Sequence, residues 1–293
     1  MLQRTITAAV GIPMVAASIW FGAPWLTVLI AVVAVQGVRE FYRLRPKGIP
    51  PLPSVLGAIW AMAFVIGAQA SSSLGNFLVI SLIILAVGTF VCLLWFIAYY
   101  TAGKSLTASL YLLAGPVYIG FLLAHSLVLW EIGDPIGDSV GDSLGDSISG
   151  AIVVSGHAGR DWLLLTILIV FATDTGAYLV GKAFGSRPLA PVISPNKTWE
   201  GAIGGLFSAL VIAIVVGFLL DLTTPKWQQV VVGATVGVIS QFGDLFESKL
   251  KRMSNAKDAG SIIPGHGGVL DRLDSVVVSI PVVYYLLSTV FDP

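Results

Sequence analysis

A segment near the C-terminus, Ser248–Asp274, concentrates the side chains that bind phosphate and metal ions. It holds five of the 16 Lys and Arg residues and three of the 16 Asp and Glu residues, although only 11% of the chain is charged. The glycines of Pro264-Gly265-His266-Gly267-Gly268 allow backbone N–H groups to approach an anion closely. The segment therefore predicts a site for phosphates and a metal ion.

Asp271 and Asp274 are three residues apart where the last apolar segment begins. Two carboxylates with this spacing can hold Mg²⁺ through their oxygens, with water and phosphate oxygens completing the octahedron. They can equally serve the helix itself, with Asp271 as N-cap and Asp274 in the first turn. His266 has no second histidine or cysteine nearby, so we expect a phosphate contact or proton donor rather than a zinc ligand.

Three other carboxylates fall inside apolar segments, where an isolated charge costs at least ~3 kcal/mol. Asp174 lies in one segment, and Asp244 and Glu247 lie in another. The apolar segment that contains Asp244 and Glu247 also carries a polar stripe at helical spacing, which leads into the Ser248–Asp274 segment. The stripe is formed by Gln241, Asp244, Ser248 and Lys251. These carboxylates either belong to the site or pair with neighbours, such as Asp244 with Ser248 or Lys251, and only hold helices together.

A second polar segment, residues 182–200, ends in Ser-Pro-Asn-Lys-Thr at 194–198, directly before an apolar segment. Ser194, Lys197 and Thr198 would form a phosphate seat at that helix N-terminus. The structural alternative is that Asn196 caps the helix, with Glu200 in its first turn. We expect the glycines that follow to pack helices together rather than to bind a ligand: Gly201, Gly204 and Gly205.

The elements that must position these groups are apolar helices. The chain has 293 residues, of which 56% are hydrophobic, and this excess indicates a polytopic membrane protein. Backbone groups in lipid must be satisfied within the segment, so the spans are helices and the fold class is an all-α membrane bundle of about nine transmembrane helices. The apolar segments are 6–22, 24–38, 52–70, 76–98, 107–130, 162–183, 201–220, 228–249 and 275–291.

The basic residues orient this bundle. With a cytoplasmic N-terminus, 14 of the 16 Lys and Arg residues fall on the inside, and only Arg160 and Lys226 fall outside. We therefore expect a multi-pass protein of the inner (plasma) membrane whose N-terminus and active site face the cytoplasm. We expect the first apolar segment to be a retained span rather than a cleaved signal peptide.

The chain reads as a single membrane domain over residues 1–293. Its parts are N-terminal spans (1–105), a middle span with a flexible outside loop (106–161) and catalytic spans with cytoplasmic loops (162–293). The outside loop repeats Gly-Asp-Ser, with acids at Asp134, Asp138, Asp142 and Asp146, and we expect no chemical role for it. The single cysteine, Cys92, excludes a disulfide framework, and the zero net charge gives no sign of a nucleic-acid partner.

The Ser248–Asp274 segment resembles the signature of CDP-diacylglycerol synthases (phosphatidate cytidylyltransferases). It has Ser, Lys-Arg, Lys-Asp, Pro-Gly-His-Gly-Gly and Asp-Arg-x-Asp at the intervals of that signature. The Asp174–Gly205 stretch is also similar, with Asp-x-x-Ala-Tyr, Phe-Gly and Ser-Pro-x-Lys-Thr-x-Glu-Gly elements. The N-terminal half is similar only in general character, apart from Glu40-Phe41, and the Gly-Asp-Ser loop departs from the family pattern.

The resemblance implies transfer of CMP from CTP to phosphatidic acid, giving CDP-diacylglycerol and pyrophosphate. It places the metal-binding aspartates on Asp244 and Asp271, which would hold Mg²⁺, and it implies a potassium ion beside it. Since two polyanions must be positioned, the other candidate catalytic residues are Lys251, Arg252, His266 and Arg272. Candidate substrate-binding residues are Ser194, Lys197, Thr198, Lys257, Gly265, Gly267 and Gly268. Asp174, Asp258 and Asp274 would orient cations or complete the metal shell.

Two other classes of protein also place carboxylates in membrane spans. An ion-coupled transporter would show matched, interrupted helices in both halves, whereas the buried charges here lie in the C-terminal half. A CTP-dependent lipid-alcohol kinase, or a synthase acting on isoprenoid lipids, is a closer alternative that the Gly-His-Gly-Gly and Asp-Arg-x-Asp elements disfavour. The expected partners are CTP, phosphatidic acid and membrane lipids, and a homodimer is one assembly among those that the sequence leaves open.

Overall fold

The computed structural model describes residues 2–49, 51–71, 73–99, 105–132, 158–222, 224–263, 265 and 267–291. The Gly-Asp-Ser loop, Pro264 and His266 lie outside the described residues. The helices before the loop are α1 (Leu2–Phe21), α2 (Trp25–Arg43), α3 (Ser54–Gln69), α4 (Leu74–Tyr99), α5 (Ser105–Gly115), the π-helix η1 (Pro116–Phe121) and α6 (Leu122–Trp130). After it come α7 (Ala158–Phe184), β1 (Pro188–Ala190), β2 (Ser194–Thr198), α8 (Trp199–Leu219), α9 (Lys226–Ser254), α10 (Leu270–Tyr285) and the π-helix η2 (Leu286–Phe291).

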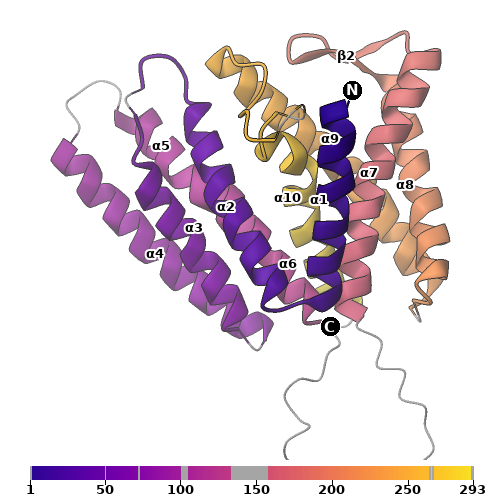
Figure 1. Ribbon diagram of the computed structural model, residues 1–293, viewed down its shortest axis with the longest axis horizontal. Coiled ribbons are helices and arrows are strands. Elements are labelled where there is room, and N and C mark those ends of the chain that lie inside the picture. The colour runs from indigo at the N-terminus through magenta and orange to yellow at the C-terminus, as the bar shows by residue number, and fades with distance from the viewer. Residues whose placement is uncertain are drawn as a thin grey trace, which may run out of the picture.

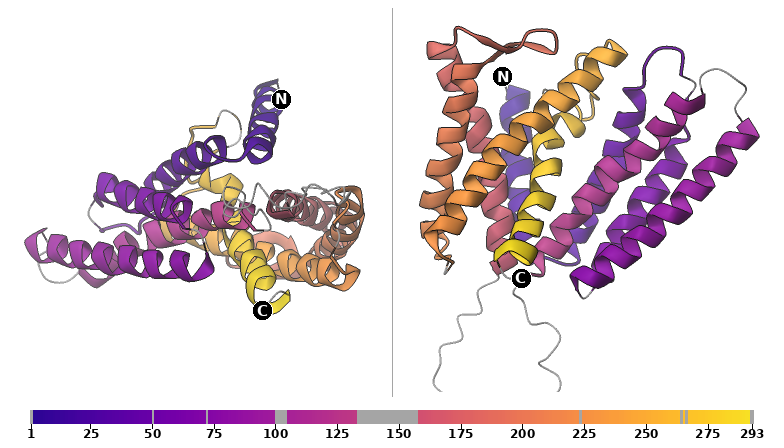
Figure 2. Two further views of the ribbon diagram at one scale, coloured as in Figure 1. Left: turned by 90° about the horizontal axis from the view of Figure 1, so that it is seen from below. Right: turned by 180° about the vertical axis from the view of Figure 1, so that it is seen from behind.

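The helices form two packed groups with α10 between them (Figure 1). α2, α3 and the α5–η1–α6 span pack together, and α7, α8 and α9 form the other group. α10 contacts α9 and α7 on one side and α6 and α2 on the other, and the two further views in Figure 2 agree with this placement. Helix α10, which carries Asp271 in its first turn, therefore contacts both halves of the chain.

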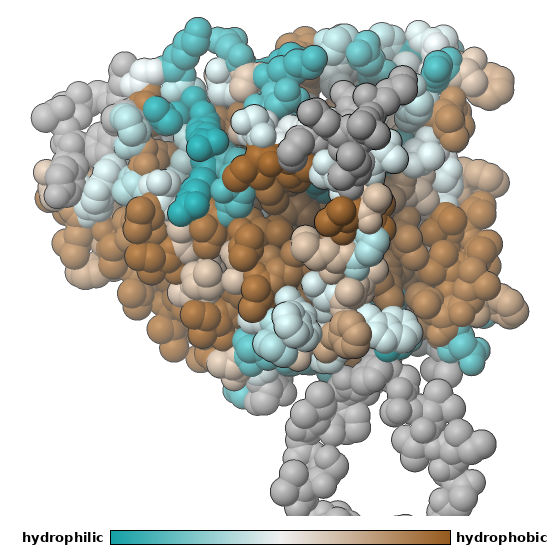
Figure 3. All heavy atoms as spheres, viewed as in Figure 1, coloured by the Kyte–Doolittle hydropathy of each residue, from teal (hydrophilic) through white to brown (hydrophobic). Residues whose placement is uncertain are grey.

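Seven helices are long and apolar enough to cross a membrane, and two shorter apolar helices, Ala9–Phe21 and Ser54–Gln69, accompany them in the described part of the chain. Each apolar segment predicted from the sequence has a helical counterpart, so the prediction of an all-α polytopic membrane protein is confirmed. Figure 3 shows a broad apolar belt between two more hydrophilic ends. Large apolar side chains such as Phe90, Ile203 and Phe218 are exposed, as expected of helices whose surface faces lipid.

The span formed by α5, η1 and α6 is interrupted at Pro116, near its middle. Pro has no N–H to donate to the helix, and the chain passes through the π-helical turn η1 before α6 resumes. The buried side chains that pack around this turn include Phe41, Phe64, Ile119 and Leu123. The core of the N-terminal group is thus built around an irregular helix.

The β1–β2 hairpin is the one regular element of the described chain that the sequence prediction lacked. Its strands are antiparallel, pairing Pro188 with Thr198 and Ala190 with Ser194. It lies at the same end of the bundle as the connection between α9 and α10 (Figure 1). We call this end, with residues 185–198 and 255–269, the motif end.

Glycines let α7 and α8 pack closely, as predicted. A Cβ atom at Gly204 would lie 2.5 Å from Val180 Cβ, and one at Gly205 would lie 2.8 Å from the Thr173 carbonyl oxygen. Gly201 is equally close to the Ala177 carbonyl oxygen, at 2.7 Å. These three glycines are therefore packing residues between α7 and α8.

We expect Gly204→Ala to lower the stability of the bundle by about 1–3 kcal/mol, because the added methyl group overpacks the α7–α8 contact. The matched control is Gly11→Ala on α1, where a Cβ atom would meet nothing within 4 Å. The measurement is the thermal unfolding midpoint of both variants in the same detergent. Equal midpoints for Gly204→Ala and the wild type would contradict the close contact.

Candidate active site

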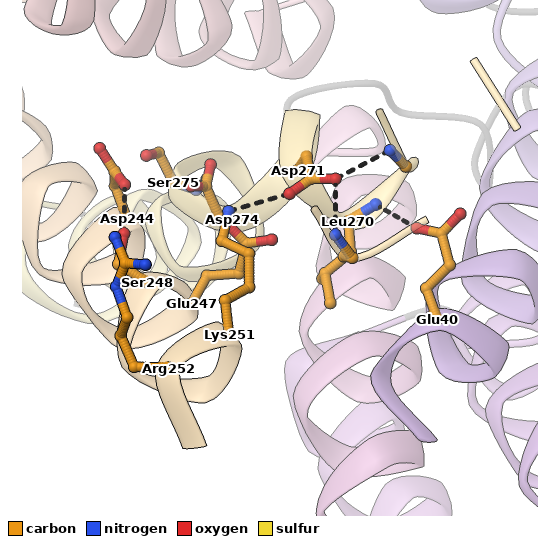
Figure 4. Close-up of polar contacts among 12 residues, drawn as sticks. Glu40, Asp244, Glu247, Ser248, Lys251, Arg252, Leu270, Asp271, Asp274 and Ser275 are labelled. Carbon is orange, nitrogen blue, oxygen red and sulfur yellow. Dashed lines mark hydrogen bonds and ion pairs between the residues drawn. The ribbon is translucent and has the colours of Figure 1, made fainter. Parts of the chain in front are cut away.

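Asp271 is the centre of a hydrogen-bonded network at the motif end (Figure 4). Its Oδ1 accepts a hydrogen bond from Lys251 Nζ at 2.9 Å. Its Oδ2 accepts from the backbone N–H groups of Ala259, at 2.9 Å, and Gly268, at 2.8 Å. The carboxylate on α10 therefore fixes both ends of the 259–268 connection and joins it to α9.

Lys251 lies between two carboxylates. Besides Asp271, its ammonium group contacts Oε2 of Glu247 at 2.7 Å, one helical turn earlier on α9. Glu247 is fully buried, and its Oε1 has no hydrogen-bond partner among the described residues. A buried ion pair of this kind adds little net stability, but removing one partner is expensive. Glu247, one of the three carboxylates predicted either to belong to the site or to pair with a neighbour, thus pairs with Lys251 within the network of Asp271.

Asp244 is the second residue of the predicted polar stripe, after Gln241, and it is held from two directions. Its Oδ1 accepts a hydrogen bond from Ser248 Oγ at 3.3 Å, one turn along α9. Its Oδ2 forms an ion pair with Lys197, which comes from β2. Arg252 Nε also donates to the Ile193 carbonyl oxygen of the hairpin at 3.1 Å. The two polar segments that the sequence analysis singled out, residues 182–200 and 248–274, therefore meet at the end of α9.

Asp274 lies between these two centres (Figure 4). It is within electrostatic reach of Asp244, Glu247 and Lys251, and its Oδ1 accepts a hydrogen bond from the Ser275 N–H at 2.7 Å. Asp174 on α7 is in turn within electrostatic reach of Asp244 and Asp274, and of Lys197 and Arg272. Carboxylates from α7, α9 and α10 therefore face a shared region, with lysines and arginines among them.

Two glycines of the loop predicted to bind phosphate, residues 264–268, have positive φ angles, which glycine adopts readily. We call this segment the glycine loop. Gly265 and Gly267 have φ angles of 77° and 83°, and Ile263 donates its N–H to the Gly267 carbonyl oxygen at 3.0 Å. A Cβ atom at Gly267 would lie 2.8 Å from Asp271 Oδ2. The N–H of Gly268, however, is directed at the protein's own carboxylate, Asp271, rather than left for a phosphate.

The remaining predicted residues differ in their surroundings. Lys257, Asp258, Arg252 and Arg272 are exposed at the motif end, and Ser194 and Lys197 are half-buried in the hairpin. The expectation that Asn196 caps α8 is wrong. Thr198 is the N-cap, in extended conformation, and its Oγ1 accepts a hydrogen bond from the Gly201 N–H at 3.1 Å. Glu200 does lie in the first turn of α8, as that alternative placed it, and it also holds the start of the hairpin by accepting a hydrogen bond from Ser186 Oγ at 2.7 Å.

Glu40 on α2 is a part of the site to which the sequence assigned no role. It is fully buried, and its Oε2 accepts a hydrogen bond from the Leu270 N–H at the start of α10, at 2.8 Å. A Cβ atom at Gly260 or Gly268 would lie 2.4 Å from its carboxylate oxygens. A signal was present: Glu40 falls on the buried face of α2, among Ala34, Gly37, Val38 and Phe41.

We expect Glu40→Gln to destabilise the protein by about 1.5–3 kcal/mol, the range for a hydrogen bond to a charged group. Gly268→Ala should act in the same direction, because its methyl group would displace the Glu40 carboxylate. The local measurement is hydrogen exchange at the Leu270 amide, which should become faster in both variants. Exchange at wild-type rates in Glu40→Gln would mean that this contact does not hold α10.

The donor set suits Mg²⁺ in chemistry, because it consists of oxygens. Hard oxygen ligands from α9 and α10 are offered by Asp244, Asp274, Ser248 and Oε1 of buried Glu247, an atom without a hydrogen-bond partner among the residues that the structure describes. In the described residues, however, no three acidic, histidine or cysteine side chains are arranged as a metal-holding group. Both oxygens of Asp271 already accept hydrogen bonds. The shared ion between Asp244 and Asp271 stays a prediction.

Comparison with known proteins agrees with this architecture. A model of the Cytidylyltransferase family matches residues 2–290. The chain belongs to the Cytidylyltransferase family. This confirms, for the whole chain, the family resemblance seen in its motifs.

Individual relatives of this Cytidylyltransferase family member carry more specific names. The chain is 46% identical over 129 residues to the "Phosphatidate cytidylyltransferase" of Staphylococcus haemolyticus (strain JCSC1435), a match covering 44% of this chain and 50% of the relative. It is 44% identical over 130 residues to that of Bacillus subtilis (strain 168), covering 44% and 48%. The match therefore spans about half the length of these curated relatives.

Proposed function

We propose that this protein is a phosphatidate cytidylyltransferase, which transfers CMP from CTP to phosphatidic acid and releases pyrophosphate. The observation that carries the proposal is the meeting of the β2 lysine, Lys197, with Asp244 and of Lys251 with Asp271, at one end of a membrane-spanning bundle. A soluble triphosphate and a lipid phosphate can reach the same depth only at such an end. The names of the relatives point to the same reaction.

The proposed chemistry needs no nucleophile from the protein. A phosphate oxygen of phosphatidic acid forms a bond to the α-phosphorus of CTP, and the bond from that phosphorus to the bridging oxygen of pyrophosphate breaks. Pyrophosphate leaves with the electron pair. The task of the protein is to position two polyanions and to stabilise the charge that develops on the phosphoryl oxygens.

Basic side chains of the motif end suit the positioning role. Lys197 and Arg252 come from elements that contact each other, and Arg272 and Lys257 are exposed beside them. Ser194 and Thr198 lie in β2, next to Lys197, and would contact a phosphate from the hairpin. His266, a predicted phosphate contact or proton donor, is retained in the proposal on the strength of the motif alone.

Mg²⁺ is part of the proposal, held by oxygens from Asp244, Asp274 and Asp271, with Asp174 and Asp258 as outer carboxylates. When bound, it would neutralise phosphate charge and ease the departure of pyrophosphate. The network around Lys251 keeps Glu247 and Asp271 in fixed positions. The potassium ion and the homodimer stay predictions without assigned residues.

The test is to incubate purified protein in lipid nanodiscs with labelled CTP, phosphatidic acid and Mg²⁺. We expect equal amounts of CDP-diacylglycerol and pyrophosphate, and neither product when a chelator removes the metal. Replacing phosphatidic acid with an isoprenoid alcohol or its phosphate tests the sibling lipid enzymes. Product from the isoprenoid substrate alone would replace the proposed substrate, and no product from any lipid in a folded preparation would reject the reaction.

The proposed location is the plasma membrane, with the motif end and the N-terminus in the cytoplasm. Lys47 lies in the α2–α3 connection at the motif end, and Lys226 starts α9 at the opposite end, and both are exposed. In a variant without Cys92, we expect Lys226→Cys to react with a membrane-impermeant maleimide in intact cells. Lys47→Cys should react only after the membrane is opened. The reverse labelling pattern would invert the topology.

A further inference from the structure

A cavity of about 440 Å³ lies beside the end of α2, apart from the carboxylate network. It is lined by Arg39, Tyr42, Arg43, Arg45, Pro51, Leu52 and Ser54. The lining contains three guanidinium groups and no carboxylate. The neighbouring Glu40 points instead toward the start of α10, where it accepts the Leu270 N–H. α2 therefore separates a basic cavity from the candidate active site.

Within the part of the chain that the structure describes, the three arginines have no acidic partner. Arg39 and Arg43 are exposed and one helical turn apart, a spacing at which like charges repel. Arg45 is fixed in place because its Nε donates to the Ile49 carbonyl oxygen at 3.0 Å and its Nη1 to the Tyr42 carbonyl oxygen at 3.2 Å. An anion in the cavity would relieve the repulsion.

The start of α3 adds a second positive feature. Ser54 is the first residue of this 16-residue helix, and the preceding Pro53 provides no side-chain cap. The first N–H groups of the helix and its dipole therefore favour an anion beside Ser54. Guanidinium groups and an uncapped helix start thus line the same cavity, and both are suited to phosphate oxygens.

The position of the cavity, at the ends of apolar helices, is the one expected of a lipid headgroup site. It lies where two apolar helices end, and its lining combines the arginines with Tyr42, Pro51 and Leu52. Figure 3 shows a hydrophilic patch over the upper end of α2 and the α2–α3 connection that reaches down beside the apolar surface. A phosphate joined to a glycerol backbone and acyl chains matches this change from charged to apolar surface better than a soluble anion does.

We propose that this cavity binds the phosphate headgroup of an anionic phospholipid. The proposal concerns binding alone, so it does not depend on CMP transfer. The proposed ligand is a phosphate that carries acyl chains, and the test distinguishes it from free inorganic phosphate.

The experiment is hydrogen exchange of the full chain in nanodiscs of phosphatidylcholine, with and without phosphatidylglycerol. Phosphatidylglycerol is anionic and is not the proposed substrate, so the candidate active site does not confuse the result. We expect exchange of the amides of residues 54–56 to slow about tenfold when the anionic lipid is at about ten times its Kd. Peptides covering residues 255–270 report the candidate active site separately.

Two variants assign the effect to the cavity. The Arg39→Gln/Arg43→Gln double variant should lose the slowing, whereas Lys47→Gln, an exposed cation of the same connection that does not line the cavity, should keep it. If the double variant fails to fold, the wild-type protein still tests the proposal. Added NaCl should then reverse the slowing of amide exchange that the anionic lipid causes. Equal exchange in both kinds of nanodisc overturns the proposal. Equal slowing by inorganic phosphate in phosphatidylcholine nanodiscs overturns the lipid assignment.

Discussion

Asp271→Asn should reduce the rate of CDP-diacylglycerol formation by about 10³-fold, the upper range for loss of one preorganised electrostatic group. Asp271 joins Lys251, Ala259 and Gly268, so its charge holds α9, the glycine loop and the start of α10 together. An amide has the same size but carries no charge, and its NH₂ group would face either the Lys251 ammonium or the two backbone N–H groups. The measurement is the initial rate with labelled CTP in nanodiscs.

Asp221→Asn is the matched control for this experiment. Asp221 is exposed between α8 and α9 and has a φ of 52°, a conformation that asparagine adopts readily. Its rate should equal that of the wild type. If Asp271→Asn also turned over at nearly the wild-type rate while correctly folded, Asp271 would be removed from the candidate active site.

Lys251→Met should give the largest loss of stability, about 3–5 kcal/mol, because it leaves Glu247 and Asp271 without their common counter-charge. Methionine keeps most of the length of the side chain, so the loss reports charge rather than volume. The measurement is the unfolding midpoint in detergent. Lys249→Met is the control, because Lys249 is exposed two residues earlier on the same helix.

A double variant distinguishes charge from packing. Adding Glu247→Gln to Lys251→Met removes the buried carboxylate that has lost its partner, so part of the stability should return. Restoration of stability would show that the uncompensated charge of buried Glu247 caused the loss. Two losses that simply add would instead assign the effect of Lys251→Met to packing.

Much of this organisation could be predicted because its determinants are local. Apolar length predicts the helices, and helical spacing places Asp244, Ser248 and Lys251 along one side of α9, where Ser248 contacts Asp244. The match of residues 174–274 to family motifs predicted the family that the whole chain belongs to. Close packing by Gly201, Gly204 and Gly205 follows from their position in an apolar helix.

The contacts that the sequence did not predict depend on tertiary structure. Pairing of β1 with β2 holds Thr198 in the extended conformation of an N-cap, and this moves the cap away from Asn196. Lys251 was predicted to bind phosphate, but the folding of α10 against α9 brings Asp271 to it. Its other contact, with Glu247, is local, one helical turn earlier on α9. The partner of Glu40, the Leu270 N–H, lies 230 residues along the chain, beyond the reach of any periodicity.

The Glu40 contact has a consequence for how the molecule unfolds. A buried carboxylate from the second helix and a backbone amide from the tenth would each be left desolvated without the other, so opening either helix group costs free energy in both. The two groups should therefore melt as one cooperative unit, and fragments split within the 133–157 region should regain activity only when both are produced together. The stability of the candidate active site at the start of α10 is in this way coupled to Glu40, a residue of the second helix.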